Sequence, residues 1–230
     1  MHTFYIENIE TITAFPESES KHAIKVLRLR NGSKVRLVNG KGIEAFGSII
    51  SDHPKHCEVS IFEQREEANN SFKIAIAIAP TKNNDRIEWF LEKAIEIGLT
   101  DFIPIVCKNS ERKKFNEERW SKVSVAALKQ SQRLWKTNIR KPIKLEEYIS
   151  EEIEGLKTIA YCGEFDKKEF SNVINKKENQ LILIGPEGDF TEEETELAFR
   201  KGFQPVSLGF NRLRTETAGV VACTLMQFGE

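Results

Sequence analysis

Two glycine-rich loops carry most of the residues that could do chemistry. In the first, Gly185-Pro186-Glu187-Gly188-Asp189 follows the apolar run Leu181–Ile184 and leads toward a helix that Thr191 can cap. An ordinary strand-to-helix connection is one interpretation, but two glycines also let a ligand approach the backbone closely. The loop has two carboxylates and no lysine, so it would repel a phosphate. It favours ribose hydroxyls, or a cationic ligand such as a sulfonium with an α-amine.

The second loop joins a strand over Val206–Leu208 to a helix over Ala218–Phe228. Tight packing explains the small residues of that helix. It does not explain Arg214-Thr215-Glu216-Thr217, which places a guanidinium, a carboxylate and two hydroxyls within four residues. If the strands are parallel, both loops lie at the carboxyl edge of one sheet, where ligands of such sheets bind.

A third glycine pattern is a false match. Gly40-Lys41-Gly42-Ile43-Glu44-Ala45 fits G-x-G-x-x-A, but a second strand follows it rather than a helix. Asn39-Gly40 between alternating runs predicts a β-hairpin instead.

The elements that must position these loops alternate between strand and helix after residue 72. The predicted strands are Phe72–Ala79, Phe102–Val106, Thr158–Cys162, Leu181–Ile184 and Val206–Leu208. The predicted helices are Asp85–Gly98, Asn116 to about Trp135, Thr191–Gly202 and Ala218–Phe228. This alternation predicts an α/β domain with a parallel sheet, and periodicity alone favours an unknotted, doubly wound one.

Residues 1–70 follow a different pattern, that of a small β-barrel. The predicted strands are Phe4–Ile6, Val35–Val38, Ile43–Ile50 and Cys57–Phe62, with Lys21–Leu29 as the helical segment. Residues 65–71 are polar and linker-like. We therefore expect a domain over 1–70 and a second over 72–230.

The composition of the chain indicates which classes of protein are possible. The chain has 230 residues, a net charge of −1 and 30% charged residues, which is typical of a soluble globular protein. There is no apolar run of ~18 residues, so no membrane span is expected. The four cysteines include no C-x-x-C pair and no secretory signal is visible, so we expect no metal site and a reducing cytoplasm. We expect the cysteines to be small buried residues. We expect Trp89, Trp120 and Trp135 to be core or dimer contacts rather than base-stacking platforms.

Although the net charge is near zero, basic residues are concentrated in separate segments of the chain. Lys21–Lys41 holds seven basic residues and no acid, and Arg119–Lys144 holds eight and no acid. A charged run is usually a solvated face, but two acid-free basic blocks in a neutral protein favour a polyanion such as RNA.

Four stretches together resemble the ribosomal RNA small subunit methyltransferase E family of the SPOUT superfamily. They are His22–Arg28 with Asn31-Gly32, Lys82 with Asp85-Arg86 and Lys93–Gly98, Gly185–Gly188, and Leu208–Ala218. The resemblance spans nearly the whole chain. Two departures stand out: Asp189 replaces a frequent third glycine, and Phe210-Asn211-Arg212 replaces the usual Pro-Arg-Ile, which shifts a positive charge by one residue.

The resemblance implies an N-terminal PUA-like barrel and a C-terminal domain with a trefoil knot that binds S-adenosylmethionine (SAM). It implies a homodimer that methylates N3 of a uridine in 16S rRNA, either naked or in an assembled small subunit. The expected cofactor contacts are Gly163, Ile184, Gly185, Glu187, Gly188, Leu208, Gly209, Leu213 and Thr217. The expected RNA contacts are Lys25, Arg28, Arg30, Arg86, Arg112, Lys129, Arg133 and Lys136.

Arg214 is the expected stabiliser of negative charge on the uracil oxygens. Glu216 is either the base or the residue that orients Arg214. We favour orientation, because a neighbouring guanidinium favours the ionised carboxylate.

Three alternatives stay open. A non-catalytic RNA-binding module would not bind SAM. A nucleotide-dependent oxidoreductase would need a G-x-G-x-x-G that leads into a helix, and the chain lacks one. A SPOUT enzyme with another rRNA or tRNA target is the nearest competitor.

Overall fold

The computed structural model describes residues 1–69, 72–111, 115–163, 166–175 and 177–229. The chain folds into two compact units. The first comprises Met1–Asn69 with Leu128–Lys136, and the second comprises Asn70–Ala127 with Thr137–Glu230. Within the described ranges, no helix is long and apolar enough to cross a membrane.

The first unit contains a four-stranded sheet in the order β1-β2-β3-β4. The strands are β1 (His2–Tyr5), β2 (Lys34–Val38), β3 (Ile43–His53) and β4 (His56–Glu66). The predicted hairpin joins β2 to β3, where Asn39 Oδ1 accepts hydrogen bonds from the backbone N–H groups of Lys41 and Ile43 at 2.8 and 3.0 Å. This confirms that the G-x-G match is a turn. β4 is longer than predicted and runs through the start of the expected linker.

The N-terminal segment borders this sheet at both edges. β1 pairs in parallel with β2, and the chain then returns along β4. There the N–H of Phe15 donates to Cys57 O at 2.8 Å, and the N–H of Val59 donates to Thr13 O at 3.0 Å. Phe4 and Leu37 are fully buried between these edges. The sheet therefore curves around its own apolar core.

The helical segment of this unit differs from the predicted Lys21–Leu29. It consists of α1 (Glu17–Lys21) and a π-helix over His22–Val26. The N–H of Leu27 donates to His22 O at 2.9 Å, which is the wider π-type bond. Arg28 follows with a φ of +56°, so the helix ends before the predicted Leu29.

A later segment completes the first unit. α3 (Glu117–Ser131) ends at Gln132, whose φ is +60°, and not near Trp135 as predicted. Beyond it, Leu134 packs on Val38, and Leu134 O accepts the N–H of Gly42 at 3.0 Å. This segment lies within the predicted second domain, residues 72–230, but belongs to the first unit.

The second unit contains an eight-stranded sheet in which every pairing is parallel, as predicted. The order is β10-β12-β9-β11-β5-β6-β7, with β8 also paired to β6. The strands are β5 (Ile74–Ile78), β6 (Asp101–Val106), β7 (Asn138–Ile139), β8 (Ile143–Lys144), β9 (Leu156–Ala160), β10 (Lys168–Glu169), β11 (Gln180–Ile184) and β12 (Gln204–Ser207).

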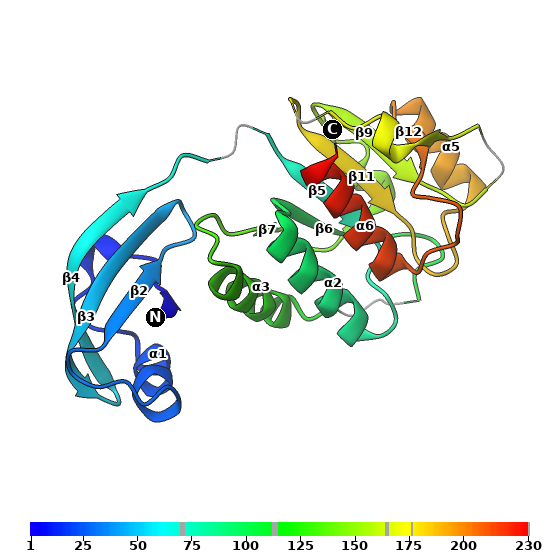
Figure 1. Cartoon of the computed structure of the whole chain (residues 1–230). Helices are drawn as coiled ribbons and strands as arrows, with labels where there is room; N and C mark the ends of the chain where they lie inside the picture. Colours follow the sequence, from blue (N-terminus) through cyan, green and yellow to red (C-terminus); the bar gives the residue numbers. More distant parts are fainter. Residues whose placement is uncertain (70–71, 112–114, 164–165, 176, 230) are drawn as a thin grey trace. The chain divides into compact units, whose positions relative to one another are not determined.

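Helices cover both faces of this sheet (Figure 1). α2 (Asn84–Ile97) and α6 (Thr215–Phe228) share one apolar cluster with β5 and β11. α4 (Leu145–Tyr148) and α5 (Glu192–Arg200) bury apolar side chains against the other face. α6 begins three residues earlier than the predicted Ala218, which places Thr215 and Glu216 in its first turn.

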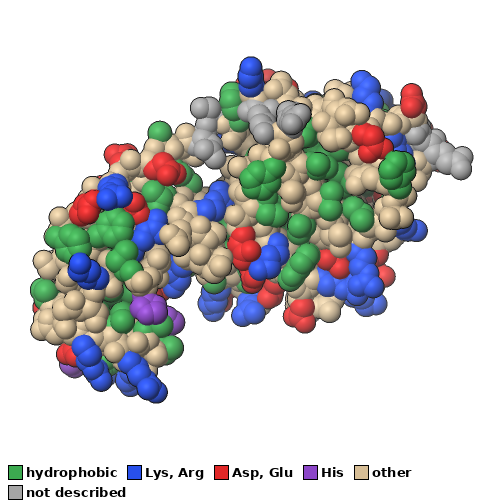
Figure 2. Space-filling model, viewed as in Figure 1, with side chains coloured by type: hydrophobic (Ala, Val, Ile, Leu, Met, Phe, Trp, Pro, Cys, Tyr) green, Lys and Arg blue, Asp and Glu red, His purple; other side chains and the backbone are tan. Residues whose placement is uncertain are grey.

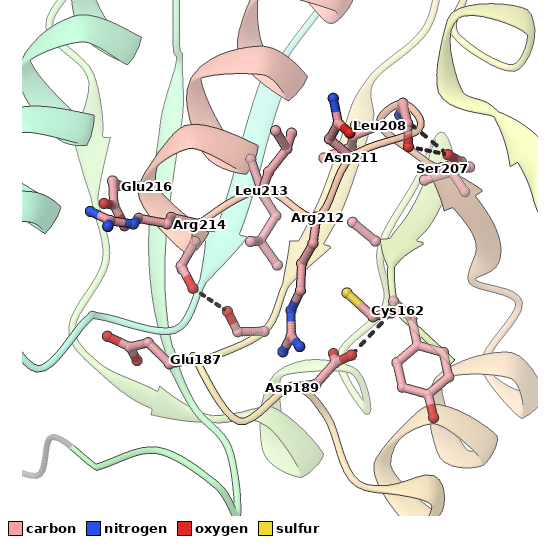
Figure 3. A pocket seen from close by; sticks show the side chains of 18 of the residues that line it. Cys162, Glu187, Asp189, Ser207, Leu208, Asn211, Arg212, Leu213, Arg214 and Glu216 are labelled. Carbon is pink, nitrogen blue, oxygen red and sulfur yellow. Dashed lines mark hydrogen bonds between the residues drawn. The ribbon is translucent and has the colours of Figure 1, made fainter. Parts of the chain in front are cut away.

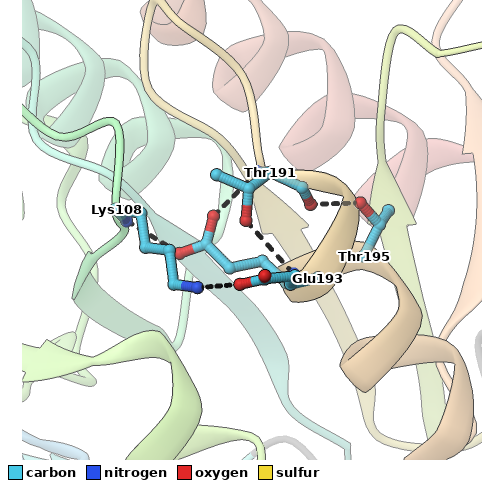
Figure 4. A network of polar contacts seen from close by, with 5 residues as sticks. Lys108, Thr191, Glu193 and Thr195 are labelled. Carbon is cyan, nitrogen blue, oxygen red and sulfur yellow. Dashed lines mark hydrogen bonds and ion pairs between the residues drawn. The ribbon is translucent and has the colours of Figure 1, made fainter.

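The start of α5 is fixed by the predicted capping box (Figure 4). Thr191 Oγ1 accepts the N–H of Glu194 at 3.3 Å, and the Glu194 carboxylate accepts the N–H of Thr191 at 2.9 Å. The other Glu194 oxygen accepts the N–H of Lys108 at 2.8 Å, and Lys108 Nζ forms an ion pair with Glu193. The chain after β6 is therefore tied to the helix that follows the first glycine loop.

Gly219 provides a test of the packing between α2 and α6. A Cβ at this position would overlap the ring of Phe90 and lie 3.2 Å from Ile78 Cδ1. We expect Gly219→Val to lower the free energy of unfolding by about 1–3 kcal/mol, as overpacking of a core does. Urea unfolding measures it. Thr224→Val, an exposed change in the same helix, is the control and should change stability by less than about 0.5 kcal/mol. Equal stability of both variants would contradict this packing.

Candidate active site

Three neighbouring strands end at one edge of the sheet, and the loops that follow them enclose a cavity (Figure 3). β9 leads into Tyr161-Cys162, β11 into the loop over 185–190, and β12 into the loop over 208–214. The cavity has a volume of about 720 Å³. The two glycine loops predicted to lie side by side both line it.

Most of the predicted catalytic and cofactor-binding residues lie together at this cavity, with Arg86 of the predicted RNA contacts. Its lining includes Arg86, Ile184, Gly185, Glu187, Leu208, Gly209, Leu213, Arg214 and Glu216. Three of the predicted cofactor contacts do not line it: Gly163 and Gly188 lie beside lining residues in the chain, and Thr217 lines a second cavity described below.

The two glycine loops are joined by a hydrogen bond at the start of α6. Thr215 Oγ1 donates to Gly185 O at 3.2 Å, and Thr215 is buried. On the opposite side, Asn109 Nδ2 donates to the carbonyl oxygens of Gly188 and Asp189, both at 3.1 Å. The first loop is therefore held from two directions.

Asp189 explains one departure from the family pattern. Its φ is +60°, a left-handed conformation that glycine adopts freely and that aspartate tolerates better than most residues. Its carboxylate accepts the N–H of Cys162 at 3.0 Å and that of Phe190 at 2.8 Å. The aspartate thus keeps the loop shape and links it to the end of β9.

The second departure lies on the other side of the same cavity. The side chain of Arg212 extends toward Asp189 (Figure 3). Nothing local in the sequence connects positions 189 and 212. The structure brings a carboxylate and a guanidinium to one cavity.

Cys162 differs from the expected buried cysteine, because it is exposed and lines the cavity. Cys57, Cys107 and Cys223 are buried as expected. Partial burial raises the pKa of the Cys162 thiol, and the Asp189 carboxylate raises it further. A thiol with a raised pKa is a poor nucleophile at neutral pH, so this group does not favour covalent catalysis.

Glu216 is almost buried in the first turn of α6, where the helix dipole favours a carboxylate. Its Oε1 lies 3.8 Å from Arg86 Nε, and its buried Oε2 has no hydrogen-bond partner among the described residues. Glu216 is thus paired with Arg86 of α2, whereas the expectation paired it with Arg214. Arg214, at the N-cap position, is exposed.

The residues predicted to bind RNA differ in their surroundings. Lys25, Arg28 and Arg30 are exposed, and Arg30 NH1 lies 3.8 Å from Asp52 Oδ2. Figure 2 shows Lys and Arg side chains interspersed with Asp and Glu side chains on one face of the molecule. Acidic residues that are distant in sequence therefore lie beside basic residues of the two acid-free segments.

The remaining predicted RNA contacts that the structure describes are less exposed to solvent. Lys129 Nζ lies 3.3 Å from Glu19 Oε1, with both side chains largely buried. Lys136 Nζ lies 5.3 Å from the centre of the Tyr5 ring, and Arg133 is partly exposed. Arg112 lies outside the described residues.

Trp89 is not a core residue, and its expected role as a dimer contact stays a prediction. Trp120 is a core residue and Trp135 packs beside the Val38 cluster. Trp89 is 46% exposed and lines a second cavity of about 650 Å³. Its position between core residues of α2 gave no sequence signal for this exposure.

Comparison with known families gives two matches along this chain. Residues 68–227 match an RNA methyltransferase domain, and residues 15–62 match an RNA methyltransferase PUA domain. The chain is also similar to the ribosomal RNA small subunit methyltransferase E of Rickettsia conorii. The two are 31% identical over 207 residues, which cover 87% of this chain and 83% of the relative.

Solved structures show the same similarity. A probable rRNA-methyltransferase from Porphyromonas gingivalis superposes with a TM-score of 0.92 at 38% identity, over 99% of this chain and 98% of that one. A Legionella pneumophila protein, assigned as a methyltransferase and solved with the bound cofactor SAM, gives a TM-score of 0.88 at 28% identity. That match covers 98% of this chain and 96% of the other.

The contact between Asp189 and Cys162 can be tested by thiol labelling. Because the carboxylate contributes to the raised pKa of Cys162, we expect Asp189→Asn to lower that pKa. The thiolate is the reactive form, so iodoacetamide should label the variant faster than the wild type at pH 8. A pH–rate profile read by mass spectrometry measures this, with Cys162→Ser as the unlabelled control. Identical profiles would contradict the electrostatic coupling.

Proposed function

The chain belongs to the RNA methyltransferase family, and from this premise we propose that it transfers a methyl group from SAM to N3 of a uridine in 16S rRNA. The observation that carries the proposal is the cavity at the ends of β9, β11 and β12. It combines apolar walls, carboxylates and exposed backbone with Arg214 and Glu216 on one side. A non-catalytic RNA-binding module would not need such a cavity.

The residues of the cavity fit SAM. Its volume lies within the range of small-molecule sites, about 300–1,000 Å³. Ile184, Leu208 and Leu213 offer apolar contacts for a purine. Glu187 and Asp189 offer acceptors for ribose hydroxyls and an α-amine, and no lysine lies in their loop.

We propose that backbone groups of the loops also contact the cofactor. Gly209 has a φ of +127° and nothing within 4 Å of a Cβ position, so a ligand can approach its backbone. Gly185, in contrast, lies against the ring of Phe190 and is held by Thr215. When bound, SAM supplies an electrophilic methyl group on a sulfonium. We infer that Gly163, Gly188 and Thr217 act by shaping these loops.

We infer that Arg214 stabilises the negative charge that develops on the uracil oxygens as N3 loses its proton. Arg214 is exposed at the edge of the cavity and can reach a bound base. Its backbone is fixed by its N-cap position, and its carbonyl accepts the N–H of Ala218 at 2.8 Å.

We infer further that Glu216 accepts the N3 proton. An unpartnered buried carboxylate oxygen is costly, and such groups often have a functional reason. The carboxyl group turns easily about its last torsion, so either oxygen can meet a donor that enters the cavity. Arg86 holds the side chain in place from α2. This role replaces the orientation of Arg214.

Two finer features of the fold belong to the same proposal. The contacts of residues 13–15 with β4 support closure of the first unit into a PUA-like barrel. β10, which lies between β9 and β11 in sequence, pairs with the outer side of β12, while Phe170 packs in the cluster that contains α6. This path supports a trefoil knot in which the chain after β12 passes through the β9–β11 connection.

We also propose that the enzyme acts in the cytoplasm as a homodimer, as the family resemblance implies. The exposed Lys25, Arg28 and Arg30 are the best candidates for contacts with rRNA phosphates. Arg86 is a candidate for contact with the target nucleotide, since it lines both cavities. Lys129 contributes less, because Glu19 already neutralises it.

Methyl transfer tests the proposal directly. Purified protein is incubated with labelled SAM and small ribosomal subunits that lack the modification, and digested RNA is analysed by mass spectrometry. We expect label in 3-methyluridine. Label in another nucleoside would retain the methyltransferase and discard the target. Absence of both label and SAM binding would contradict the enzyme and favour an RNA-binding module.

The role of Glu216 predicts a loss confined to the chemical step. Glu216→Gln keeps the shape of the side chain but cannot take up the proton, so kcat should fall by about 10²–10⁴-fold. The Kd for SAM, measured by calorimetry, should stay within about threefold of wild type. Glu92→Gln, at an exposed carboxylate of α2 that lines neither cavity, is the matched control and should retain activity. A kcat within tenfold of wild type for Glu216→Gln would exclude the base.

A further inference from the structure

A second cavity adjoins the first and shares its wall. It has a volume of about 650 Å³. Residues common to both cavities are Arg86, Arg212, Leu213, Arg214 and Glu216. The second cavity adds Asp85 and Trp89 from α2 and Thr217 from α6. The ion pair of Arg86 and Glu216 therefore lies where one cavity meets the other.

Trp89 is unusual among the apolar residues of α2. Ile87, Phe90, Leu91 and Ala94 are fully buried against the sheet. Trp89 lies off this stripe with 46% of its surface exposed. It is three residues after Arg86, so both side chains lie on one face of the helix. Packing among the described residues of the second unit leaves the indole exposed at a cavity that Glu216 also lines.

The chemistry of this cavity matches a nucleotide that has left its stack. An aromatic face stacks on any base, and guanidinium groups pair with phosphate or with carbonyl oxygens. Arg212 and Arg214 are exposed at its rim. Glu216, with an unpartnered oxygen, offers an acceptor for an N–H donor at the shared wall. Uracil presents one such donor, N3–H, between two carbonyl oxygens.

We propose that the second cavity holds the target uridine, with its base stacked on Trp89 and its N3 edge toward Glu216. The inference rests on the proposed function and adds the residue that selects an unstacked nucleotide. Enzymes that modify a base must extrude it, and an aromatic platform stabilises the extruded state. Trp89 thus contributes to binding of the RNA, while Arg214 and Glu216 act on the reacting atoms.

Three substitutions at one position test this role. Trp89→Ala removes the aromatic face, Trp89→Leu keeps apolar bulk without it, and Trp89→Phe restores it. We expect kcat/KM for undermethylated small subunits to fall by about 5- to 150-fold in the Ala and Leu variants, the range for loss of one base–aromatic stack. Trp89→Phe should lie within about threefold of wild type, and SAM affinity should be unchanged in all three.

Phe228→Ala is the matched control, because this aromatic is 66% exposed on α6 and lines neither cavity. Its kcat/KM should stay within about twofold of wild type. Wild-type kcat/KM in Trp89→Ala, or in Trp89→Leu, would overturn the stacking role. A change of sedimentation coefficient in Trp89→Ala would overturn it in favour of an interface between copies of the chain. A failure of the wild type to form 3-methyluridine would reject the proposed function instead.

Discussion

The second unit depends on the parallel direction of its strands. Because neighbouring strands run the same way, each carboxyl end opens into a loop at one edge, and three such loops meet beyond β9, β11 and β12. No strand pairing continues into these loops, so other hydrogen bonds must hold them. Thr215 supplies one to Gly185, and Asp189 supplies two through its carboxylate. The geometry of the cavity therefore depends on a few side chains at the bases of the loops. These side chains fix the loops that carry the residues proposed to act in catalysis.

The parts of the fold that could be predicted are those whose causes are local. The capping box at Thr191, the Asn39-Gly40 turn and the apolar stripe of α2 each depend on residues within a few positions of one another. The predicted ends of helices were wrong where contacts between residues distant in sequence determine the end. α6 begins early because Thr215 binds a carbonyl from another loop, and α3 ends early where the chain turns at Gln132 into the first unit.

The same distinction applies to the candidate site. The glycine loops were identified from their sequence because closely spaced glycines and charged groups are visible without a structure. The relation of Asp189 to Arg212 was not identified, since it exists only across the cavity. The exposure of Trp89 at the second cavity was not identified either. The partner of Glu216 was also misjudged. Proximity in sequence favoured Arg214, but Arg214 is the N-cap with an extended backbone, and the ion pair is formed by Arg86 of α2.

The Leu128–Lys136 segment has a consequence for the order of folding during translation. The buried guanidinium of Arg36 donates to Gln132 O at 3.2 Å, and Gly42 donates to Leu134 O. These acceptors leave the ribosome only after β5, α2, β6 and most of α3 have been synthesised. The first unit therefore cannot complete its contacts when β4 emerges from the ribosome. Its β2–β3 hairpin gains these hydrogen bonds only after a segment from the middle of the chain has been synthesised, and the second unit is completed later still, because it includes α6.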